Sequence, residues 1–381
     1  MADPSPLAPL QEILRARGFH RRAPFAVIAE LALHTLLTVG GMVMLTCPFP
    51  LWVRGAGLLI SAYGTLGVAT NTHTSTHGGT SERRWVNDAL SAYGFPFFVA
   101  LSLTYWRRAH LAVHHPAPNV IGVDDDADFA PYFASLDVEV EAARGFRRFY
   151  FEKLQWLAFP WVVWLNVYTR HVAGWRFIAS ALRDPARRRA IHALDIALLA
   201  LHYLTFIGVP ALFVGLPEAA WLYFLRISLF GLGLFLALAP GHYPYAAAAV
   251  KKGGDRGDFV LGQTATTVNF RTGPLGRLVC SGLEYQIEHH LFPSYSHVHY
   301  PKMSPLVRAF CEEHGYPYRT LGWAESLFQT CAMFYRPKVV AERLSRVEPA
   351  APDERVEGGD EVEVEGVSSL VLQERRKTTA P

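Results

Sequence analysis

Residues 24–70 read PFAVIAELALHTLLTVGGMVMLT, then CPFP, then LWVRGAGLLISAYGTLGVAT, and this stretch decides the fold class. A helix needs about 20 mostly apolar residues to cross a bilayer, and each of the two long runs has that length. The four-residue link between them is short enough to force an antiparallel turn. Pro24–Thr46 and residues 51–70 are therefore predicted to form a hairpin of two membrane-spanning helices.

A second pair of apolar runs has the same form, because residues 193–216 and 219–239 are joined by a short link around Pro217. Both short links lack Lys and Arg, which gather instead in the N-terminal segment and the long connections. Positive charge stays on the cytoplasmic side of a membrane, so both termini and every long loop are predicted to be cytoplasmic. The predicted fold is an all-α polytopic membrane protein with four transmembrane helices in two hairpins.

Two shorter apolar stretches do not fit as further spans. Residues 89–106 are interrupted by Gly94 and Pro96, and residues 154–168 are rich in tryptophan, which favours the headgroup level. Both are predicted to be interfacial or re-entrant helices. The chain is thus divided into a cytoplasmic segment (1–23), a membrane domain with a cytoplasmic histidine-rich cap (24–345), and a tail (346–381). The tail has no helical apolar stripe and is expected to be disordered.

Composition narrows the function classes. Hydrophobic residues make up 51% of the chain and charged residues 18%, against about 25% charged residues in soluble domains. The net charge of +3, without a basic stripe interleaved with aromatics, gives no support to nucleic-acid binding. The four cysteines form no CxxC pair, which argues against a disulfide scaffold or a zinc ribbon.

Histidines carry the functional signal, because four groups of them lie on the predicted cytoplasmic side. The groups are His73 and His77; His110, His114 and His115; His242; and His289 and His290. Residues four apart on a helix share a face, so His73 with His77, and His110 with His114, are predicted to face one point each. His115, about 100° round the helix from His114, is predicted to face a second point, and His289 and His290 repeat that divergence. Eight imidazoles predict two nearby metal ions.

The ligand type leaves the metal open, since imidazole suits zinc, copper, iron and nickel. Structural zinc is satisfied by four ligands and usually recruits Cys, whereas hydrolytic zinc needs about three ligands and an open water position. Eight nitrogens at a membrane surface are better explained by a two-metal, oxygen-activating site.

The stretch Gln286-Ile-Glu-His289-His290-Leu-Phe-Pro293 closely resembles the third histidine box of the membrane fatty acid desaturase family. The resemblance is strongest to the branch with glutamine at the head of this box, which includes front-end acyl desaturases. Residues 119–128, 263–270 and 302–318 also resemble family segments, so the resemblance covers residues 25–320. The first histidine box, residues 73–77, has Thr-Ser-Thr between its histidines, where an acidic residue is common in relatives. The double-bond position made by those relatives is therefore not carried over to this chain.

The resemblance implies a di-iron centre that uses O₂ to desaturate a lipid acyl chain. The implied iron ligands are His73, His77, His110, His114, His115, His289 and His290, with His242 as an additional ligand. Gln286 is implied as a weak ligand or a support for the ligands, and Asn269 as a support acting directly or through water. No His-Pro-Gly-Gly haem loop is present, so a separate electron donor, a cytochrome b-type protein or a ferredoxin, is expected.

Three other readings remain open at this point. The same centre could hydroxylate, ketolate or epoxidise, because histidine spacing does not report the fate of the oxygen. A zinc hydrolase would need a carboxylate beside the histidines, and Glu288 is the only one inside a box. A metal transporter would place its ligands within the bilayer. For the desaturase, the acyl tunnel is expected to be lined by Phe95, Phe97, Phe98, Tyr105, Trp106 and Trp156.

Overall fold

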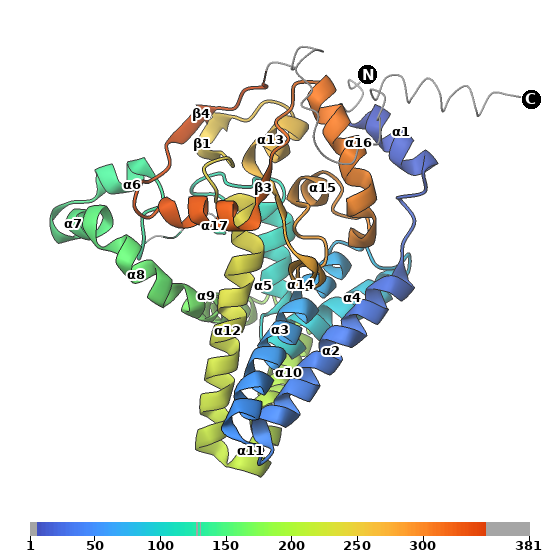
Figure 1. Cartoon of the computed structure of the whole chain (residues 1–381), viewed down its shortest axis with the longest axis vertical. Helices are drawn as coiled ribbons and strands as arrows, with labels where there is room; N and C mark the ends of the chain where they lie inside the picture. Colours follow the sequence, from blue (N-terminus) through green and yellow to red (C-terminus); the bar gives the residue numbers. More distant parts are fainter. Residues whose placement is uncertain (1–5, 127–128, 130, 348–381) are drawn as a thin grey trace, which may run out of the picture.

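The computed structural model describes residues 6–126, 129 and 131–347 of the 381-residue chain. A narrow bundle of long helices widens at one end into a cap of short helices and strands (Figure 1). Most of the predicted disordered tail lies outside the described residues, which include only Arg346 and Val347 of it.

Four helical stretches in the described residues are long and apolar enough to cross a membrane, as the sequence predicted. They are α2 (Pro24–Thr46), α3 (Leu51–Thr76), Ala190–Val214 and α12 (Leu216–His242). The third consists of α10 (Ala190–Tyr203), the π-helix η4 (Leu204–Gly208) and α11 (Val209–Val214). α3 and α12 continue past their predicted ends, and this extension carries His73 and His242 into their final turns.

The first hairpin is closed by small residues where α2 and α3 touch. A Cβ on Gly41 would lie 2.5 Å from the Ser61 nitrogen, and one on Gly64 would lie 2.6 Å from the Thr38 nitrogen. Glycine allows the two backbones this close approach, which is the usual way in which membrane helices gain packing contacts. The tight hairpin sets the position of the histidines at the end of α3.

A sharply bent pair of helices follows the first hairpin. α4 (Arg84–Ala92) and the π-helix η1 (Tyr93–Phe98) meet α5 (Leu103–Trp106) and the π-helix η2 (Arg107–His114) at a bend of 116°. This bend agrees with the re-entrant option predicted for residues 89–106, and the pair would be a fifth span only if counted as one helix. Asp195 of α10 holds the bend by accepting hydrogen bonds from Ser102 Oγ (2.6 Å) and the Leu103 nitrogen (2.9 Å).

An arm projects sideways between bundle and cap (Figure 1). It contains α6 (Asp137–Ala142), α7 (Gly145–Lys153) and α8 (Gln155–Val162), and it returns to the bundle through the 3₁₀-helix η3 (Val163–Leu165) and α9 (Asn166–Arg183). The tryptophan-rich residues 154–168 belong to this arm and are not among the four candidate spans. Trp161, at 75% exposure, lies on the outer surface of α8.

The cap is built mostly from the second half of the chain. Its helices are α13 (Phe259–Thr266), α14 (Pro274–Cys280), α15 (Gln286–Leu291), η5 (His297–His299), α16 (Tyr300–Glu313) and α17 (Trp323–Ala332), together with α1 (Ala8–Ala16). Two short parallel pairs join β1 (Ala249–Asp255) to β4 (Val340–Arg343) and β2 (Asn269–Arg271) to β3 (Thr320–Gly322). The all-α prediction did not include these strands, because segments such as Lys-Lys-Gly-Gly-Asp lack the alternation of a half-buried strand.

The N-terminal helix packs against the cap rather than the bundle. Leu10, Ile13 and Leu14 of α1 are buried in one apolar cluster with Phe310 of α16. At the other described end, the Val347 nitrogen donates to the Gly315 carbonyl just after α16. Both described ends therefore lie on the cap side of the bundle.

Candidate metal centre

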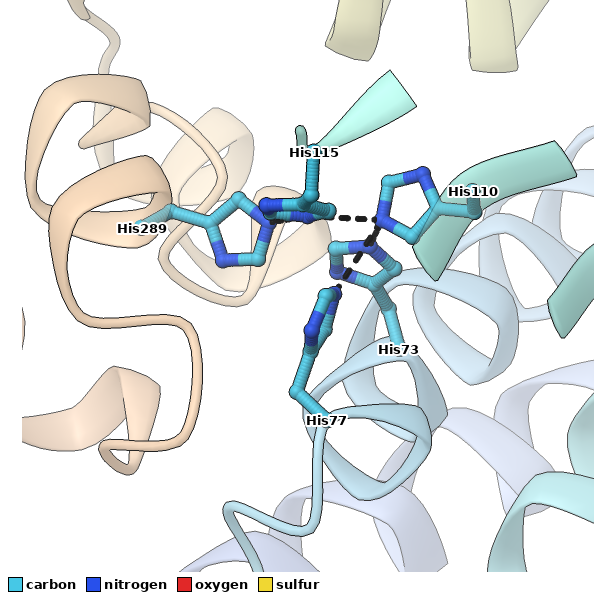
Figure 2. A group of neighbouring side chains, drawn as sticks. All are labelled: His73, His77, His110, His115 and His289. Carbon is cyan, nitrogen blue, oxygen red and sulfur yellow. Dashed lines mark hydrogen bonds between the residues drawn. The ribbon is translucent and has the colours of Figure 1, made fainter. Parts of the chain in front are cut away.

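Five imidazoles converge on one point where the bundle meets the cap. His73 and His77 come from the end of α3, His110 and His115 from η2 and the residue after it, and His289 from α15 (Figure 2). One ring nitrogen from each lies within 4.8 Å of the others. Segments far apart in the sequence thus supply one compact nitrogen cluster.

The spacing of these nitrogens fits a metal ion. The Nε2 atoms of His77 and His110, of His110 and His115, and of His115 and His289 are each 3.1 Å apart. Those of His73 and His110 are 2.6 Å apart. With metal–nitrogen bonds of about 2.1 Å, neighbouring imidazole nitrogens at right angles around one ion lie about 3 Å apart. The five residues can therefore hold one ion without large rearrangement.

A second group lies directly beside the first. It contains His114, His242 at the end of α12, and His290 of α15. Nε2 of His290, Nδ1 of His242 and Oε1 of Gln286 are buried and have no hydrogen-bond partner among the described residues. Buried polar atoms are normally satisfied, so this unpaired set fits a second ion. The two groups are adjacent, because the ring centroids of His115 in the first group and His290 in the second are 4.4 Å apart.

The predicted sharing of one point by His110 and His114 is wrong. The segment Arg107–His114 is a π-helix, in which the backbone bonds from residue i to i+5, and the His115 nitrogen donates to the His110 carbonyl. The wider turn brings His110 and His115 to the same face and leaves His114 to the second group. The predicted divergence of His289 and His290 does appear, because each lies in a different group.

Hydrogen bonds on the far side of the rings orient the second group. Nδ1 of His114 lies 2.9 Å from Oδ2 of Asp124, and Nδ1 of His290 lies 2.9 Å from Oε1 of Gln263. Gln263 also donates from Nε2 to the His115 carbonyl at 2.9 Å. Such outer partners fix the tautomer and leave Nε2 free for a metal.

Burial keeps several of these rings neutral. Desolvation lowers the pKa of His77 to about 3 and lowers the pKa of His115, His289 and His290 well below the usual value. Nearby histidines reinforce the shift, because a second positive charge in the cluster would repel the first. Neutral imidazole is the form that binds metals, so these histidines are in a form that could bind a metal ion at neutral pH.

Asn269 and Glu288 face away from the histidines. Asn269 accepts a hydrogen bond from the Ile287 nitrogen (2.9 Å) and donates to Oε2 of Glu288 (2.8 Å). Tyr318 donates to the other oxygen of Glu288 at 2.6 Å. Asn269 therefore anchors α15 through its first turn, and both oxygens of Glu288 are occupied by hydrogen bonds there. Gln286, in contrast, lies against Gly241, next to His242.

Aromatic rings border the first group on its bundle side. The Trp106 ring stacks on His110, with centroids 4.5 Å apart, and Phe95 stacks on Trp106 at 4.8 Å. Trp156 does not belong with them, because it lies on the arm against Tyr335 and is 43% exposed. The predicted lining role of Trp156 is therefore wrong, since burial beside the centre cannot be judged from residue type alone.

Comparison with known proteins places the chain among membrane lipid enzymes. The sequence profile of the family described as fatty acid desaturase matches residues 49–322. The chain belongs to the fatty acid desaturase family. Members of this family are oxidoreductases that introduce double bonds into acyl chains, and this membership favours neither the hydroxylase nor the transporter reading.

Individual relatives agree with the family assignment. The sn-1 linoleoyl-lipid 6-desaturase of Synechocystis sp. is 27% identical over 278 residues, which cover 70% of this chain and 75% of that protein. The Delta(8)-fatty-acid desaturase of Euglena gracilis is 28% identical over 320 residues, 81% of this chain and 73% of its own length. The Acyl-lipid (9-3)-desaturase of Physcomitrium patens is 26% identical over 71% of this chain, which spans half of that protein.

Several residues that shape the centre were given no role by the sequence. Asp124 and Gln263 lie in segments that already resembled the family, and a polar residue near a histidine box was the available signal. Asp195 is an isolated carboxylate in an apolar helix, a pattern that marks intramembrane polar residues for attention. Lys338, whose Nζ donates to the carbonyls of Tyr243 and Pro244 just after His242, has no local sequence signal at all.

Proposed function

We propose that this desaturase holds two iron ions in the two histidine groups and uses O₂ to introduce a C=C bond into a membrane-lipid acyl chain. The observation that supports this most is the pair of adjacent histidine groups at the end of the membrane bundle. When bound, the irons would supply the oxygen activation that removes hydrogen from an unactivated CH₂. Overall, CH₂–CH₂, O₂, two electrons and two protons would give CH=CH and two waters.

The protein's own part in this reaction is placement and exclusion. The histidines of box 2 (residues 110–115) and box 3 (residues 286–293) would hold the two ions side by side, because each box supplies neighbouring residues to both groups. The stacked pair Trp106 and Phe95 would position the acyl chain on the bundle side of His110 and exclude water there. Errors of about 1 Å in such placement can cost roughly 100-fold in rate.

An anionic headgroup or carrier is the proposed polar end of the substrate. A cavity of ≈ 250 Å³ is lined by Arg108, Arg187, Arg189 and His192. Arg108 comes two residues before His110, so this basic cavity lies on the segment that carries box 2. Guanidinium groups bind phosphate through paired hydrogen bonds, and relatives named as linoleoyl-lipid and acyl-lipid desaturases agree with an acyl chain on a polar headgroup.

The cap is proposed to face the cytoplasm, with both termini on that side. The arginines of the N-terminal segment, the arm and the long connections support this orientation through the positive-inside tendency. A separate electron-transfer protein, a cytochrome b-type protein or a ferredoxin, would dock on the same side and deliver the two electrons.

Lipid profiling tests the proposal directly. A bacterial host that also expresses ferredoxin and its reductase would carry the wild-type chain, His289→Ala or, as a control, the exposed His20→Ala. Acyl species two mass units lighter with wild type and His20→Ala, and their absence with His289→Ala, are expected. Species sixteen mass units heavier would show that the enzyme hydroxylates or epoxidises rather than desaturates. Identical profiles in all three strains would contradict the proposal.

A further inference from the structure

The fourth span contains a proline in its last turn, and this proline removes the backbone donor of one carbonyl. Pro240 has no N–H, so the carbonyl of Leu236 loses its usual i+4 donor. The indole Nε1 of Trp323, the first residue of α17, donates to that oxygen at 3.0 Å. A side chain from the cap thus replaces the missing backbone bond in the helix that carries His242.

The last four carbonyls of α12 each have a hydrogen-bond partner, and three of these partners come from other segments. Ser326 Oγ donates to the Pro240 carbonyl at 2.6 Å. The Ala239 carbonyl accepts from the Tyr243 nitrogen (2.9 Å), the Gly241 carbonyl from the Val268 nitrogen (2.9 Å) and the His242 carbonyl from Asn119 Nδ2 (2.7 Å). The Ser326 bond is the second contribution of α17 to this helix end.

A buried lysine secures the turn that follows His242. Lys338 is 7% exposed, and its Nζ donates to the carbonyls of Tyr243 (3.3 Å), Pro244 (3.0 Å) and Ala247. Its backbone is fixed in turn, because its nitrogen donates to the Ser135 carbonyl at 2.9 Å.

We infer that residues 323–338, here called the C-terminal strap, position His242 for the second metal group. The strap begins where the family match at residues 49–322 ends, and Figure 1 shows α17 beside the cap end of α12. Its bonds to the α12 segment fall on residues 236–247, around His242. The inference rests on the proposed two-metal centre.

The two metal groups differ in their dependence on the strap. The first group has no member on α12, whereas the second takes His242 from it. Loosening the strap should therefore weaken binding of the second ion and leave binding of the first unchanged. A general loss of folding would release both ions together, so the metal count separates positioning from structural support.

Metal retention tests this dependence in the full-length protein. Purified, iron-loaded protein in detergent would be challenged with a chelator, and the iron per chain would be measured by mass spectrometry. Wild type is expected to retain two ions, and Lys338→Met one, because loss of an outer partner weakens metal affinity about 10- to 100-fold. Lys338→Arg, which keeps the cationic donor, and Lys302→Met, at an exposed site, should both retain two.

Pro240 provides a second test that does not depend on Lys338. Trp323→Phe removes the donor to the Leu236 carbonyl, so this variant should lose the second ion to the chelator. Trp85→Phe, an exposed control, should retain it. Adding Pro240→Ala to Trp323→Phe restores a backbone N–H for Leu236 and should restore the second ion. This pair decides the matter if Lys338→Met does not fold.

Two results would overturn the role of the strap. One is full retention of both ions in Lys338→Met and Trp323→Phe, and the other is simultaneous loss of both ions from a variant that remains folded. A wild-type protein that binds two ions without desaturating would refute the proposed function and leave the strap intact. A wild-type protein that binds fewer than two would refute the two-metal centre itself.

Discussion

His114 is hydrogen-bonded to Asp124, with Nδ1 and Oδ2 2.9 Å apart, and both side chains are buried. Asp124 also accepts from the Asn119 nitrogen at 2.9 Å, so the carboxylate is fixed before any metal binds. This arrangement orients Nε2 of His114 toward His242 and His290. Asp124 therefore fixes the orientation of one histidine of the second group.

Asp124→Asn should weaken binding of the second ion, because an amide cannot hold the imidazole in its metal-binding tautomer as a carboxylate does. A loss of about 10- to 100-fold in metal affinity or activity is expected. Iron content after chelator treatment measures the effect, with the exposed neighbour Asp125→Asn as the control. Equal iron retention in the two variants would show that the Asp124 contact is not needed.

Asp195→Ala should loosen the bend that carries box 2. The carboxylate accepts four hydrogen bonds, from Ser102 Oγ, Thr104 Oγ1 and the nitrogens of Leu103 and Thr104. Hydrogen bonds to a charged group are worth about 1.5–3 kcal/mol each, so a clear fall in the thermal unfolding midpoint in detergent is expected. Ser102→Ala should cause a smaller fall, and an unchanged midpoint in Asp195→Ala would rule out this capping role.

Arg226 of α12 is fully buried in the bundle, where its Nη1 donates to Thr65 Oγ1 at 2.9 Å. Among the described residues its Nε and Nη2 have no hydrogen-bond partner, although Phe206 lies under the guanidinium at 4.5 Å. Removing a buried charge that lacks an ion pair should not destabilise the fold. Arg226→Met is therefore expected to unfold at the same or a higher temperature, and a lower midpoint would contradict this expectation.

The metal-free protein should lose stability as the pH falls below the usual histidine range. The pKa of His77 is about 3 in the folded chain and 6.5 when unperturbed, so between these values the unfolded state binds more protons. Stability then falls with falling pH, by up to about 1.4 kcal/mol per pH unit for each such histidine. Thermal midpoints between pH 7.5 and 5.5 measure the slope.

A matched variant isolates the histidine contribution to this slope. His77→Gln removes one of the buried imidazoles, so the midpoint of its metal-free form should depend less steeply on pH. Bound metal should raise the wild-type midpoint without flattening this dependence, because it also holds the rings neutral in the folded state while the unfolded state still takes up protons. A wild-type midpoint that does not change over this pH range would contradict the assignment of neutral, buried histidines.

The spans were predictable because their signal is local. The bounds of α2 coincide with the predicted Pro24–Thr46, since about 20 apolar residues between polar ends leave little freedom in a bilayer. The location of the eight histidines on one side of the bundle was also predictable, from the hydropathy of the spans and the distribution of Lys and Arg. Their assignment to ligands remains a prediction, as does the division of the chain at residues 23 and 345.

The pairing of histidines within the centre was not predictable from spacing. The rule of four assumes an α-helix, and nothing in Arg107–His114 announces a π-helix. The roles of Trp323 and Lys338 were equally hidden, because each depends on a contact between segments more than 80 residues apart. Such tertiary contacts leave no periodic trace in the sequence.

The π-helix of box 2 has a consequence for how this centre tolerates change. A π-turn contains one residue more than an α-turn, so deleting one residue between His110 and His114 would restore the ordinary pitch. The deletion would keep every imidazole but turn the rings of box 2 to new directions, and the two groups would no longer share this segment. The proposed metal centre would therefore depend on backbone pitch as much as on side-chain identity, and insertions or deletions here should be less tolerated than most substitutions between the histidines.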